Sequence, residues 1–335
     1  MSTVHFVLPS NVDDPATPSG GNVYDRRISD GLTALGWQVR EHPVRANAAE
    51  VLATLPDDSV VLVDGLLSSG IPPAQTRRLR LVILMHMPLE NELERHLLAE
   101  VAAVVTTSFW SRLHLLDIYG LPADRVHAAP PGVDAAQLVP GSETGSRLLC
   151  VAAVAPHKGH DTLVAALGAI ADMAWSCVCV GTLERDPGFV DRLRGLARGL
   201  APGRVSFVGP RIGEELDAEY AAADLLVLPS RAETYGMVVT EALARGIPVV
   251  ATEVNGLPEA LGHAPDGNLP GILVPPADPA ALAAALRGWL EDSELRVQLR
   301  RSAQHRRTTL TSWAVTSEIV ASVLSRVAAN VSVGL

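Results

Sequence analysis

The chain has 335 residues, with 27 lysines and arginines against 37 aspartates and glutamates, which gives a formal net charge of −10. This acidity argues against nonspecific binding to nucleic acid or to an anionic lipid surface. The 48% of hydrophobic residues excludes a disordered chain, and three cysteines are too few for a disulfide framework. The sequence contains no apolar run of membrane-spanning length and opens without a basic leader, so we expect a cytoplasmic protein.

Short apolar runs alternate with amphipathic stretches of helical length in the first part of the chain. This alternation is typical of an α/β protein with a parallel sheet. The pattern predicts strands at Val4–Leu8, Val60–Val63, Leu81–Met85 and Ala103–Thr107, and helices over 22–35, 89–99 and 109–118.

The alternation stops at a segment rich in proline and glycine and restarts after it. Residues 130–132 and 140–146 carry no apolar periodicity, which indicates a linker. We therefore expect an N-terminal domain over 1–140, a C-terminal domain over 147–312 and a C-terminal helix over 313–335 that packs back on the N-terminal domain. The later strands are predicted at Leu148–Val154, Ser176–Val180, Val205–Val208, Leu225–Leu228, Ile247–Ala251 and Ile272–Val274, and helices at 161–170 and over most of 278–327.

Two parallel sheets place their functional residues in a predictable way. Ligands of open parallel sheets bind beyond the carboxyl ends of the strands, so we expect a site in a cleft between two such edges. Polar residues that directly follow strands are therefore the candidates, and the sequence offers three such loops.

The first loop, Ala155–Asp161, contains Lys158, the single lysine of the sequence. A lysine in a chain that otherwise uses arginine indicates a position that needs a compact ammonium, although codon bias with one surviving lysine explains the same count. We expect Asp161 to cap the helix that follows. A cation near a helix N-terminus suits a phosphate oxygen, so Lys158 is a candidate phosphate ligand.

The second loop contains Gly20-Gly21-Asn22 at the first strand-to-helix turn. Glycines let the backbone approach a ligand closely, and a helix N-terminus attracts an anion, but the same residues also fit an ordinary flexible loop. The motif G-x-G-x-x-G is absent here and after Val180. This absence argues against a nicotinamide-dependent dehydrogenase.

The third segment, 229–252, reads as strand end, loop, helix and strand, and it contains two glutamates eight residues apart. Glu233 lies in the predicted loop and Glu241 in the predicted helix. On their own they are also explained as an acid that complements a helix dipole and as a solvent-facing helical acid. The helix begins near Gly236, where the amides of Gly236, Met237 and Val238 are placed to bind an anion.

These loops together resemble glycosyltransferase family four. The run from Glu233 to Glu241, followed by Ala-Leu-Ala-Arg-Gly-Ile-Pro-Val-Val-Ala-Thr, resembles the spaced double-glutamate signature of that family, and the resemblance is strongest from Leu148 to Pro276. The Pro-His-Lys-Gly loop, the Gly-Gly loop and His86-Met87-Pro88 match in kind and order. The resemblance implies the GT-B fold, in which two Rossmann-like domains face each other across a cleft, and a retaining hexosyltransferase that uses a nucleotide-diphosphate sugar.

The resemblance also implies roles in the C-terminal, donor-binding domain. Glu241 matches the acid that holds the ribose hydroxyls of the nucleotide. Glu233 matches the acid that contacts the transferred sugar, and Lys158 matches the cation on the diphosphate. The chemistry agrees, because breaking a glycosyl–phosphate bond builds negative charge on the departing diphosphate, which a cation stabilises.

In the N-terminal, acceptor-binding domain, Gly20 and Gly21 match the loop that approaches the diphosphate. His86 matches the histidine that faces the sugar near the reacting carbon; without the resemblance, a lone histidine after an apolar run is more often a structural residue. We expect Lys158, Glu233 and His86 to be the catalytic residues. Three further residues are possible acceptor contacts: Tyr24, Asp25 and Glu90.

One position departs from the family pattern. Members of the family often carry an arginine that holds the diphosphate where this sequence has Ala153. A phosphate contact is therefore missing or supplied by another residue. His157, Arg211 and Arg231 are the alternatives, and the sequence does not choose among them.

We expect no metal ion and no cofactor beyond the nucleotide-sugar co-substrate, because protein groups can neutralise a diphosphate. Asp13-Asp14 and Asp57-Asp58 superficially resemble metal-binding acids, but Asp57-Asp58 follows Pro56 as in an ordinary turn. The arginines of the late helices are more typical of a solvated face than of a membrane contact, so peripheral membrane binding is not expected.

The leading hypothesis is a glycosyltransferase that uses a UDP- or GDP-sugar and a small-molecule or glycan acceptor. An isomerase or phosphorylase of the same architecture, acting on nucleotide sugars or polysaccharides, is an alternative. A second alternative is a nucleotide-sugar-binding module without activity, which the departure at Ala153 favours.

Overall fold

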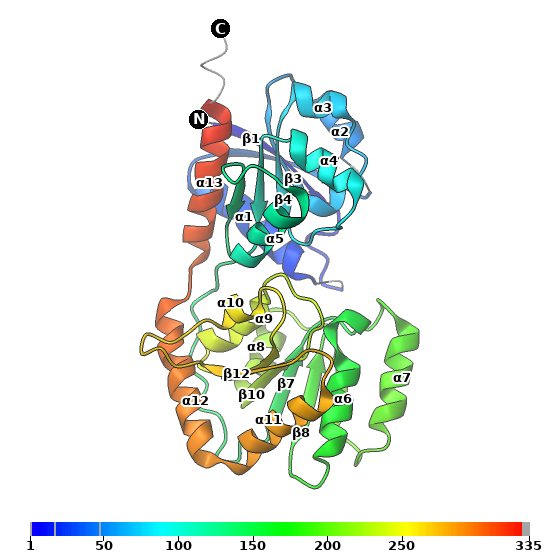
Figure 1. The fold of residues 1–335 in the computed structure, drawn as a ribbon, viewed down its shortest axis with the longest axis vertical. Coiled ribbons are helices and arrows are strands. Elements are labelled where there is room, and N and C mark those ends of the chain that lie inside the picture. The colour runs from blue at the N-terminus through cyan, green and yellow to red at the C-terminus, as the bar shows by residue number, and fades with distance from the viewer. Residues whose placement is uncertain (1, 17, 47, 330–335) are drawn as a thin grey trace. The chain divides into compact units, whose positions relative to one another are not determined.

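The structure, a computed structural model, describes residues 2–16, 18–46 and 48–329 and contains two compact units (Figure 1). Unit 1 comprises the chain up to Asp14, Ser19–Gly132 and the chain from Thr311 onward, and unit 2 contains Val133–Leu310. Each unit is built on a six-stranded parallel sheet, which confirms the predicted α/β class. Within the described ranges, none of the helices combines the length and hydrophobicity that a bilayer crossing requires.

The sheet of unit 1 has the strand order β2-β1-β3-β4-β5-β6. Its central strands are apolar and buried because helices cover both faces of the sheet. The strands are β1 (Thr3–Pro9), β2 (Gln38–Val44), β3 (Val60–Asp64), β4 (Arg80–Met85), β5 (Ala103–Thr106) and β6 (Val126–Ala128). The helices are α1 (Gly20–Ala34), α2 (Ala49–Thr54), α3 (Pro73–Arg78), α4 (Glu92–Glu100), α5 (Phe109–Tyr119) and α13 (Trp313–Ala329), with the 3-10 turn η1 (Gly65–Leu67).

The strands β3 and β4 are neighbours, and Asp64 pairs in register with Leu84. The last residue of β3 is therefore level with the end of β4, where His86 follows Met85. This register brings Asp64 and His86 to the same edge of the sheet, the edge at which ligands of parallel sheets bind.

Helix α13 completes the core of unit 1 although it lies at the far end of the sequence. Val320, Val323 and Leu324 of this helix are buried in the cluster that contains Tyr24 and Ile28 of α1. The two helices approach closely, because a Cβ built on Gly31 of α1 would lie 1.9 Å from Oγ of Ser317. Only a residue without a side chain fits there.

Unit 2 has the strand order β12-β11-β10-β7-β8-β9, with helices around two buried apolar clusters. Its strands are β7 (Arg147–Val151), β8 (Ser176–Val180), β9 (Val205–Gly209), β10 (Leu225–Leu228), β11 (Val249–Thr252) and β12 (Gly271–Val274). Its helices are α6 (His160–Ala169), α7 (Pro187–Ala197), α8 (Gly213–Ala222), α9 (Met237–Ala244), α10 (Leu257–Leu261), α11 (Pro279–Glu291) and α12 (Ser293–Arg306), with the 3-10 turns η2 (Pro156–Lys158) and η3 (Arg307–Thr309).

The segment predicted as a linker has no helix or strand over 129–146, but most of it is bound to unit 2. The amide of Val139 donates to the carbonyl of Arg245 (2.9 Å), and both the amide and the hydroxyl of Ser142 donate to the carboxylate of Asp224 (2.5 and 2.6 Å). The boundary between the units accordingly falls between Gly132 and Val133, and not at residue 140 as expected from the sequence.

Candidate functional site

Lys158 lies in the turn η2, beyond the carboxyl end of β7. Gly159 follows with a φ of +70°, and a Cβ at this position would lie 2.0 Å from the carbonyl oxygen of Pro229, which follows β10. Only glycine fits both the backbone conformation and the space. The lysine loop is thereby fixed against the end of the neighbouring strand β10.

The predicted helix cap at Asp161 is wrong. Helix α6 begins at His160, and Gly159 occupies the cap position, so Asp161 lies within the first turn. The carboxylate of Asp161 instead accepts a hydrogen bond from Arg231 (2.7 Å). Asp161 therefore connects the lysine loop to the loop that follows β10.

Lys158 and Glu233 form an ion pair in which Nζ lies 2.5 Å from Oε2. Both side chains are largely buried, with exposed fractions of 19% and 16%. The loop that carries Glu233 is held by the turn after β11, because the amide of Glu233 donates to Oδ1 of Asn255 (3.2 Å) and its carbonyl accepts from the amide of Gly256 (3.0 Å). Loops after three adjacent strands, β7, β10 and β11, meet at this pair.

Helix α9 begins directly after the Glu233 loop. Its cap residue is Gly236, which has a φ of +92° in the left-handed region, and no side chain caps the helix. A Cβ on Gly236 would lie 2.5 Å from Cδ2 of Leu257, so that side chain would have to move, and the φ of +92° itself favours glycine. The first turn of α9 therefore presents the amides of Gly236, Met237 and Val238 with the positive end of the helix dipole.

Glu241 lies one turn further along α9 and has one carboxylate oxygen occupied. Its Oε2 accepts a hydrogen bond from the hydroxyl of Tyr220 on α8 (2.7 Å). The guanidinium of Arg245 stacks on the Tyr220 ring, 4.5 Å from its centroid, and donates to the Glu241 carbonyl (2.9 Å). Burial raises the pKa of Glu241, against the lowering effects of Tyr220 and Arg245. Tyr220 thus orients a carboxylate whose chemistry suits a pair of hydroxyl groups.

Of the three residues that could replace the missing arginine, Arg231 and Arg211 form hydrogen bonds or ion pairs with other protein groups. Ala153 is partly buried at the family's arginine position. Arg231 donates to the carbonyl of Pro156 (2.5 Å) as well as to Asp161, and Arg211 pairs with Glu215 one turn away (3.2 Å). His157 is exposed beside Lys158, whose charge adds to the effect of burial in lowering the pKa of this imidazole.

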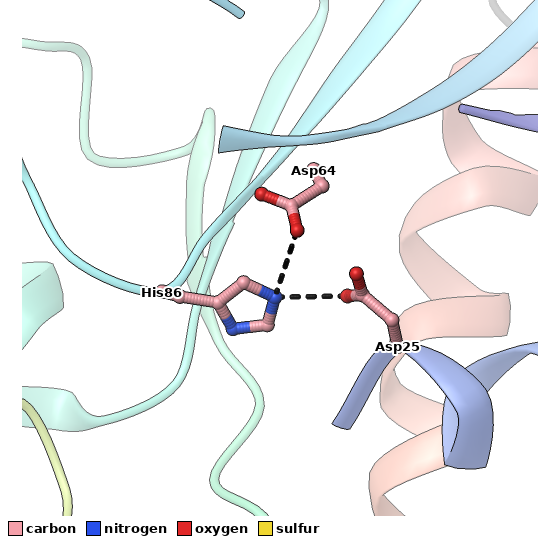
Figure 2. A group of neighbouring side chains, drawn as sticks. All are labelled: Asp25, Asp64 and His86. Carbon is pink, nitrogen blue, oxygen red and sulfur yellow. Dashed lines mark hydrogen bonds and ion pairs between the residues drawn. The ribbon is translucent and has the colours of Figure 1, made fainter. Parts of the chain in front are cut away.

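In unit 1, His86 lies against two buried aspartates (Figure 2). Its Nε2 is 2.8 Å from Oδ1 of Asp25 on α1 and 3.9 Å from Oδ2 of Asp64 at the end of β3. The exposed fractions of the Asp25, Asp64 and His86 side chains are 0%, 1% and 12%. Oδ1 of Asp64 also accepts from the amide of Leu66 (2.6 Å), which fixes this carboxyl group at the start of η1.

The charges of this cluster shift the pKa values of two of its members. Burial lowers the pKa of His86, but the neighbouring carboxylates of Asp25 and Asp64 outweigh it and raise the pKa to about 9. Burial raises the pKa of Asp64 to about 7, with a contribution from the negative charge of Asp25 and an opposing one from His86. At neutral pH the cluster therefore combines a protonated imidazole with at least one carboxylate.

Gly20 and Gly21 form the first turn of α1 and not a loop before it. Ser19 caps this helix by accepting a hydrogen bond from the amide of Asn22 (3.1 Å). A Cβ on Gly21 would lie 3.4 Å from the His86 ring, at ordinary contact distance. The structure thus places Gly21 next to His86, in the first turn of a helix and therefore at its positive end.

The three predicted acceptor contacts differ in their exposure. Tyr24 is buried in the core, and its hydroxyl donates to the carbonyl of Ala129 (2.7 Å). Asp25 is fully buried beneath His86 and contacts that ring instead of an acceptor. Glu90 has a φ of +54°, and its carboxylate accepts a hydrogen bond from His114 (2.9 Å). Its side chain is 59% exposed and therefore accessible to a ligand.

Asp25, Asp64 and His86 are also the group in the described part of the chain whose atoms lie close enough to hold a metal ion, within 4.8 Å of one another. In this structure Nε2 of His86 is hydrogen-bonded directly to Oδ1 of Asp25 (2.8 Å). The sequence also contains two acidic pairs that superficially resemble metal ligands, Asp13-Asp14 and Asp57-Asp58. In the structure Asp13, Asp57 and Asp58 each form an ion pair with an arginine.

Comparison with known proteins identifies the second unit. Residues 145–292 match the family model described as glycosyl transferases group 1. This segment is similar to the group 1 glycosyltransferases. The predicted resemblance to glycosyltransferase family four is thereby confirmed, and the matched residues include Lys158, Glu233 and Glu241.

The curated relatives share this part of the sequence. D-inositol 3-phosphate glycosyltransferases of Salinispora tropica and Corynebacterium glutamicum are 33% and 31% identical over 239 and 255 residues. These alignments cover 63% and 70% of this chain, but only 48% and 59% of the relatives. The chain therefore spans about half the length of the curated relatives it matches.

Solved structures show the fold over almost the whole chain. Sucrose-phosphate synthase from Thermosynechococcus elongatus has a TM-score of 0.79 at 23% identity, covering 98% of this chain and 100% of that one. A glycosyltransferase from Rickettsia africae has a TM-score of 0.76 at 18% identity, with 97% and 98% covered. Anabaena HepE in complex with UDP-glucose has a TM-score of 0.76 at 17% identity, with 97% and 100% covered. The predicted GT-B fold class is confirmed.

Three residues that help to build the site, Asp64, Asn255 and Tyr220, were not predicted from the sequence. Asp64 ends the buried strand β3, and an acid at the carboxyl end of an apolar run is visible in the sequence. Asn255 follows β11 at a φ of +46°, a conformation that favours asparagine. Tyr220 gives no such signal, because its contact with Glu241 depends on how α8 packs against α9.

Proposed function

We propose that the chain is a retaining glycosyltransferase that moves a hexosyl group from a nucleotide-diphosphate sugar to an acceptor hydroxyl without a metal ion. The observation that carries this proposal is the ion pair of Lys158 and Glu233 beside the uncapped N-terminus of α9. A cation, a carboxylate and free helix amides meet at the carboxyl edge of the sheet in unit 2, where parallel sheets bind their ligands.

These groups match the charges that the reaction develops. The bond between the anomeric carbon and the diphosphate oxygen breaks, which leaves negative charge on the diphosphate and positive charge on the sugar ring. Lys158 and the amides at the start of α9 stabilise the departing diphosphate, so no metal ion is needed for that purpose. Glu233 binds hydroxyl groups of the sugar, and the double-glutamate segment supports the retaining outcome through its resemblance to family four.

Glu241 is the proposed ligand of the nucleotide ribose. Its carboxylate is oriented by Tyr220, and one of its two oxygens is left for the hydroxyl pair. For the nucleotide we propose UDP or GDP; Anabaena HepE, which shares the fold, is named as a complex with UDP and with UDP-glucose. Donor binding then breaks the ion pair, since Lys158 turns to the diphosphate and Glu233 to the sugar.

The names of the curated relatives supply the first acceptor to test, D-inositol 3-phosphate. Unphosphorylated inositol is the matched control, because it has the same hydroxyl groups without the charge. Transfer to the phosphorylated compound alone supports the acceptor class of the relatives. Transfer to neither compound leaves the donor chemistry to be measured with other hydroxyl acceptors.

The test is incubation with UDP- and GDP-sugars in the presence and absence of acceptor, followed by analysis of nucleotide and sugar products. Acceptor-dependent release of the nucleoside diphosphate, with retention at the anomeric carbon by NMR, supports the transferase. Interconversion of donors without acceptor supports the isomerase alternative. Calorimetric binding of donor without any turnover supports the binding module and refutes the proposal.

A further inference from the structure

We propose that Asp25 and Asp64 are positioning residues that share one proton and hold His86 as an imidazolium, with its Nδ1–H presented to the substrate. This inference rests on the proposed function for its consequence in the reaction, but its geometry and its central test concern unit 1 alone. Three observations support it: the hydrogen-bond pattern of the His86 ring, the charge balance of a buried cluster, and an unpaired carboxylate oxygen.

The two nitrogens of the His86 ring have different surroundings. Nε2 faces both carboxylates, whereas Nδ1 points away from them (Figure 2). Within the described ranges of the chain, Nδ1 has no hydrogen-bond partner and is not among the unpaired polar atoms that are fully buried. With Nε2–H donating to Asp25, the ring has a fixed orientation, and Nδ1 is the atom left for a ligand.

The charge balance requires a proton between the two acids. Asp25 and Asp64 are 0% and 1% exposed, and two buried carboxylates beside one imidazolium would carry an uncompensated negative charge. Among the described residues, Oδ2 of Asp25 is buried and has no hydrogen-bond partner. One proton held between the two carboxyl groups makes the cluster neutral and gives this oxygen a donor.

Among the described residues, Asp25 and Asp64 are the charged groups that act on the pKa of His86. Helix α1 contributes Asp25 and the neighbouring Tyr24, whose ring packs edge-on against His86 and whose hydroxyl binds a backbone carbonyl. The end of β3 contributes Asp64, and α13 contributes the neutral Trp313, which packs edge-on against Tyr24. The guanidinium of Arg27 lies over the Trp313 ring, 5.9 Å from its centroid. The pKa of His86, raised to about 9, is set by Asp25 and Asp64 against the effect of burial.

The consequence is that His86 acts as a hydrogen-bond donor and not as a base at neutral pH. A protonated imidazole has no lone pair with which to accept the proton of an acceptor hydroxyl. Its Nδ1–H binds an oxygen atom of the substrate and favours negative charge on it. The reaction must then pass the acceptor proton to a different group.

The central test is an NMR pH titration of the free protein with labelled histidines, with His86→Gln used to assign the signal. We expect His86 to titrate near pH 9 and to show protonation at both nitrogens at pH 7. The double variant Asp25→Asn with Asp64→Asn should bring the midpoint below about 6.5, the value of a free histidine, because burial then acts alone. A wild-type midpoint near 6.5, or one that the double variant leaves unchanged, overturns the proposal without recourse to any activity.

Kinetics of the single variants separate positioning from a structural role. Asparagine resembles a protonated aspartate, so Asp64→Asn should keep kcat within about threefold of the wild type at pH 7. Asp25→Asn removes the carboxylate that accepts from His86, so it should lower kcat at least about tenfold with little change in the KM for the donor. Asp57→Asn, at an exposed ion pair of the same unit, is the control and should leave kcat unchanged. Equal losses in both single variants contradict the shared proton.

A metal ion is the competing reading, and the same samples decide it. Zn²⁺ or Mn²⁺ that shifts or broadens the His86 signal at stoichiometric amounts, with activity lost in EDTA and restored by the ion, overturns the proton-sharing network. If the titration succeeds but no sugar is transferred, the proposed function fails while the network stands. If transfer occurs but His86 is neutral at pH 7, the network fails while the proposed function stands.

Discussion

The ammonium nitrogen of Lys158 lies 2.5 Å from a carboxylate oxygen of Glu233, although the two residues are 75 positions apart in the sequence. They meet because β7 and β10 are neighbours in the sheet and because Gly159 lets the lysine loop pack against the end of β10. The two charges neutralise each other and hold both side chains in place.

Replacing Lys158 with alanine should lower kcat by about 10²–10³-fold, since the departing diphosphate loses its cation. Lys158→Arg should recover only part of this loss, because a planar guanidinium does not occupy the place of a compact ammonium. Steady-state kinetics measures both. Arg211→Ala, which removes an exposed pair with Glu215, is the control with unchanged kcat. Wild-type rates in Lys158→Ala would discard the phosphate role.

Glu241→Gln should weaken binding of the nucleoside diphosphate by about 10-fold or more, because the carboxylate makes charge-assisted hydrogen bonds to the ribose. Calorimetry with UDP and GDP gives the affinity directly. Tyr220→Phe removes only the hydroxyl that orients this carboxylate and should have a smaller effect. Equal affinities in Glu241→Gln and the wild type would exclude the ribose contact.

Gly159→Ala should destabilise the protein by roughly 2–3 kcal/mol, because a Cβ would lie 2.0 Å from the Pro229 carbonyl and the φ of +70° disfavours alanine. Gly168→Ala on the same helix is the matched control. No atom lies within 4 Å of a Cβ there, and the change should stabilise by about 0.5–1 kcal/mol. Urea unfolding measures both. A loss of stability in the control would show that α6 itself tolerates no change.

The contribution of Asp64 and His86 to the stability of unit 1 should fall as the pH rises from about 4 to 9. The pKa of Asp64 is raised to about 7 and that of His86 to about 9, so in the folded state these two groups bind more protons than they do in the unfolded chain throughout this range. The stabilising contribution of Asp64 is lost as the pH rises from the usual pKa of an aspartate towards 7. The stabilising contribution of His86 is lost as the pH rises from the usual pKa of a histidine towards 9. In Asp64→Asn the acidic part of this dependence should disappear, which thermal unfolding at pH 5, 7 and 9 checks.

Metal removal should leave transfer within about twofold of its original rate, because Lys158 and the amides of α9 supply the positive charge that a metal ion would otherwise provide. The measurement is activity after dialysis against EDTA, with Mg²⁺ and Mn²⁺ added back to separate aliquots. A loss that the added ion restores would reverse the prediction of a metal-independent enzyme.

The central strands could be predicted from the sequence because each is a short apolar run buried on both faces. The two edge strands of unit 1, β2 and β6, could not be predicted. Strand β2 contains Arg40, Glu41 and Pro43 and is largely exposed, and an edge strand tolerates both charge and proline. Strand β6 has only three residues, Val126–Ala128, which is too short for a periodic signal.

Lys158, Glu233 and Glu241, the proposed donor-binding residues, could be picked out because they lie in or just after loops that follow strands and carry a family signature. The orientation of α1 was available but overlooked. Tyr24, Ile28 and Leu32 recur every four residues and form its buried face, so Tyr24 belongs to the core. The pairing of Tyr220 with Glu241 could not be read from the sequence, since it depends on the packing of two helices.

The return of α13 to unit 1 sets the order in which the two cores are completed during translation. Val133–Leu310 of unit 2 is one continuous stretch, whereas unit 1 needs Val320, Val323 and Leu324 beside α1. The ribosome therefore releases everything that unit 2 requires before the earlier-synthesised unit can close its own interior. A released chain that ends at residue 310 should therefore protect the later unit from protease while the earlier one stays open to cleavage.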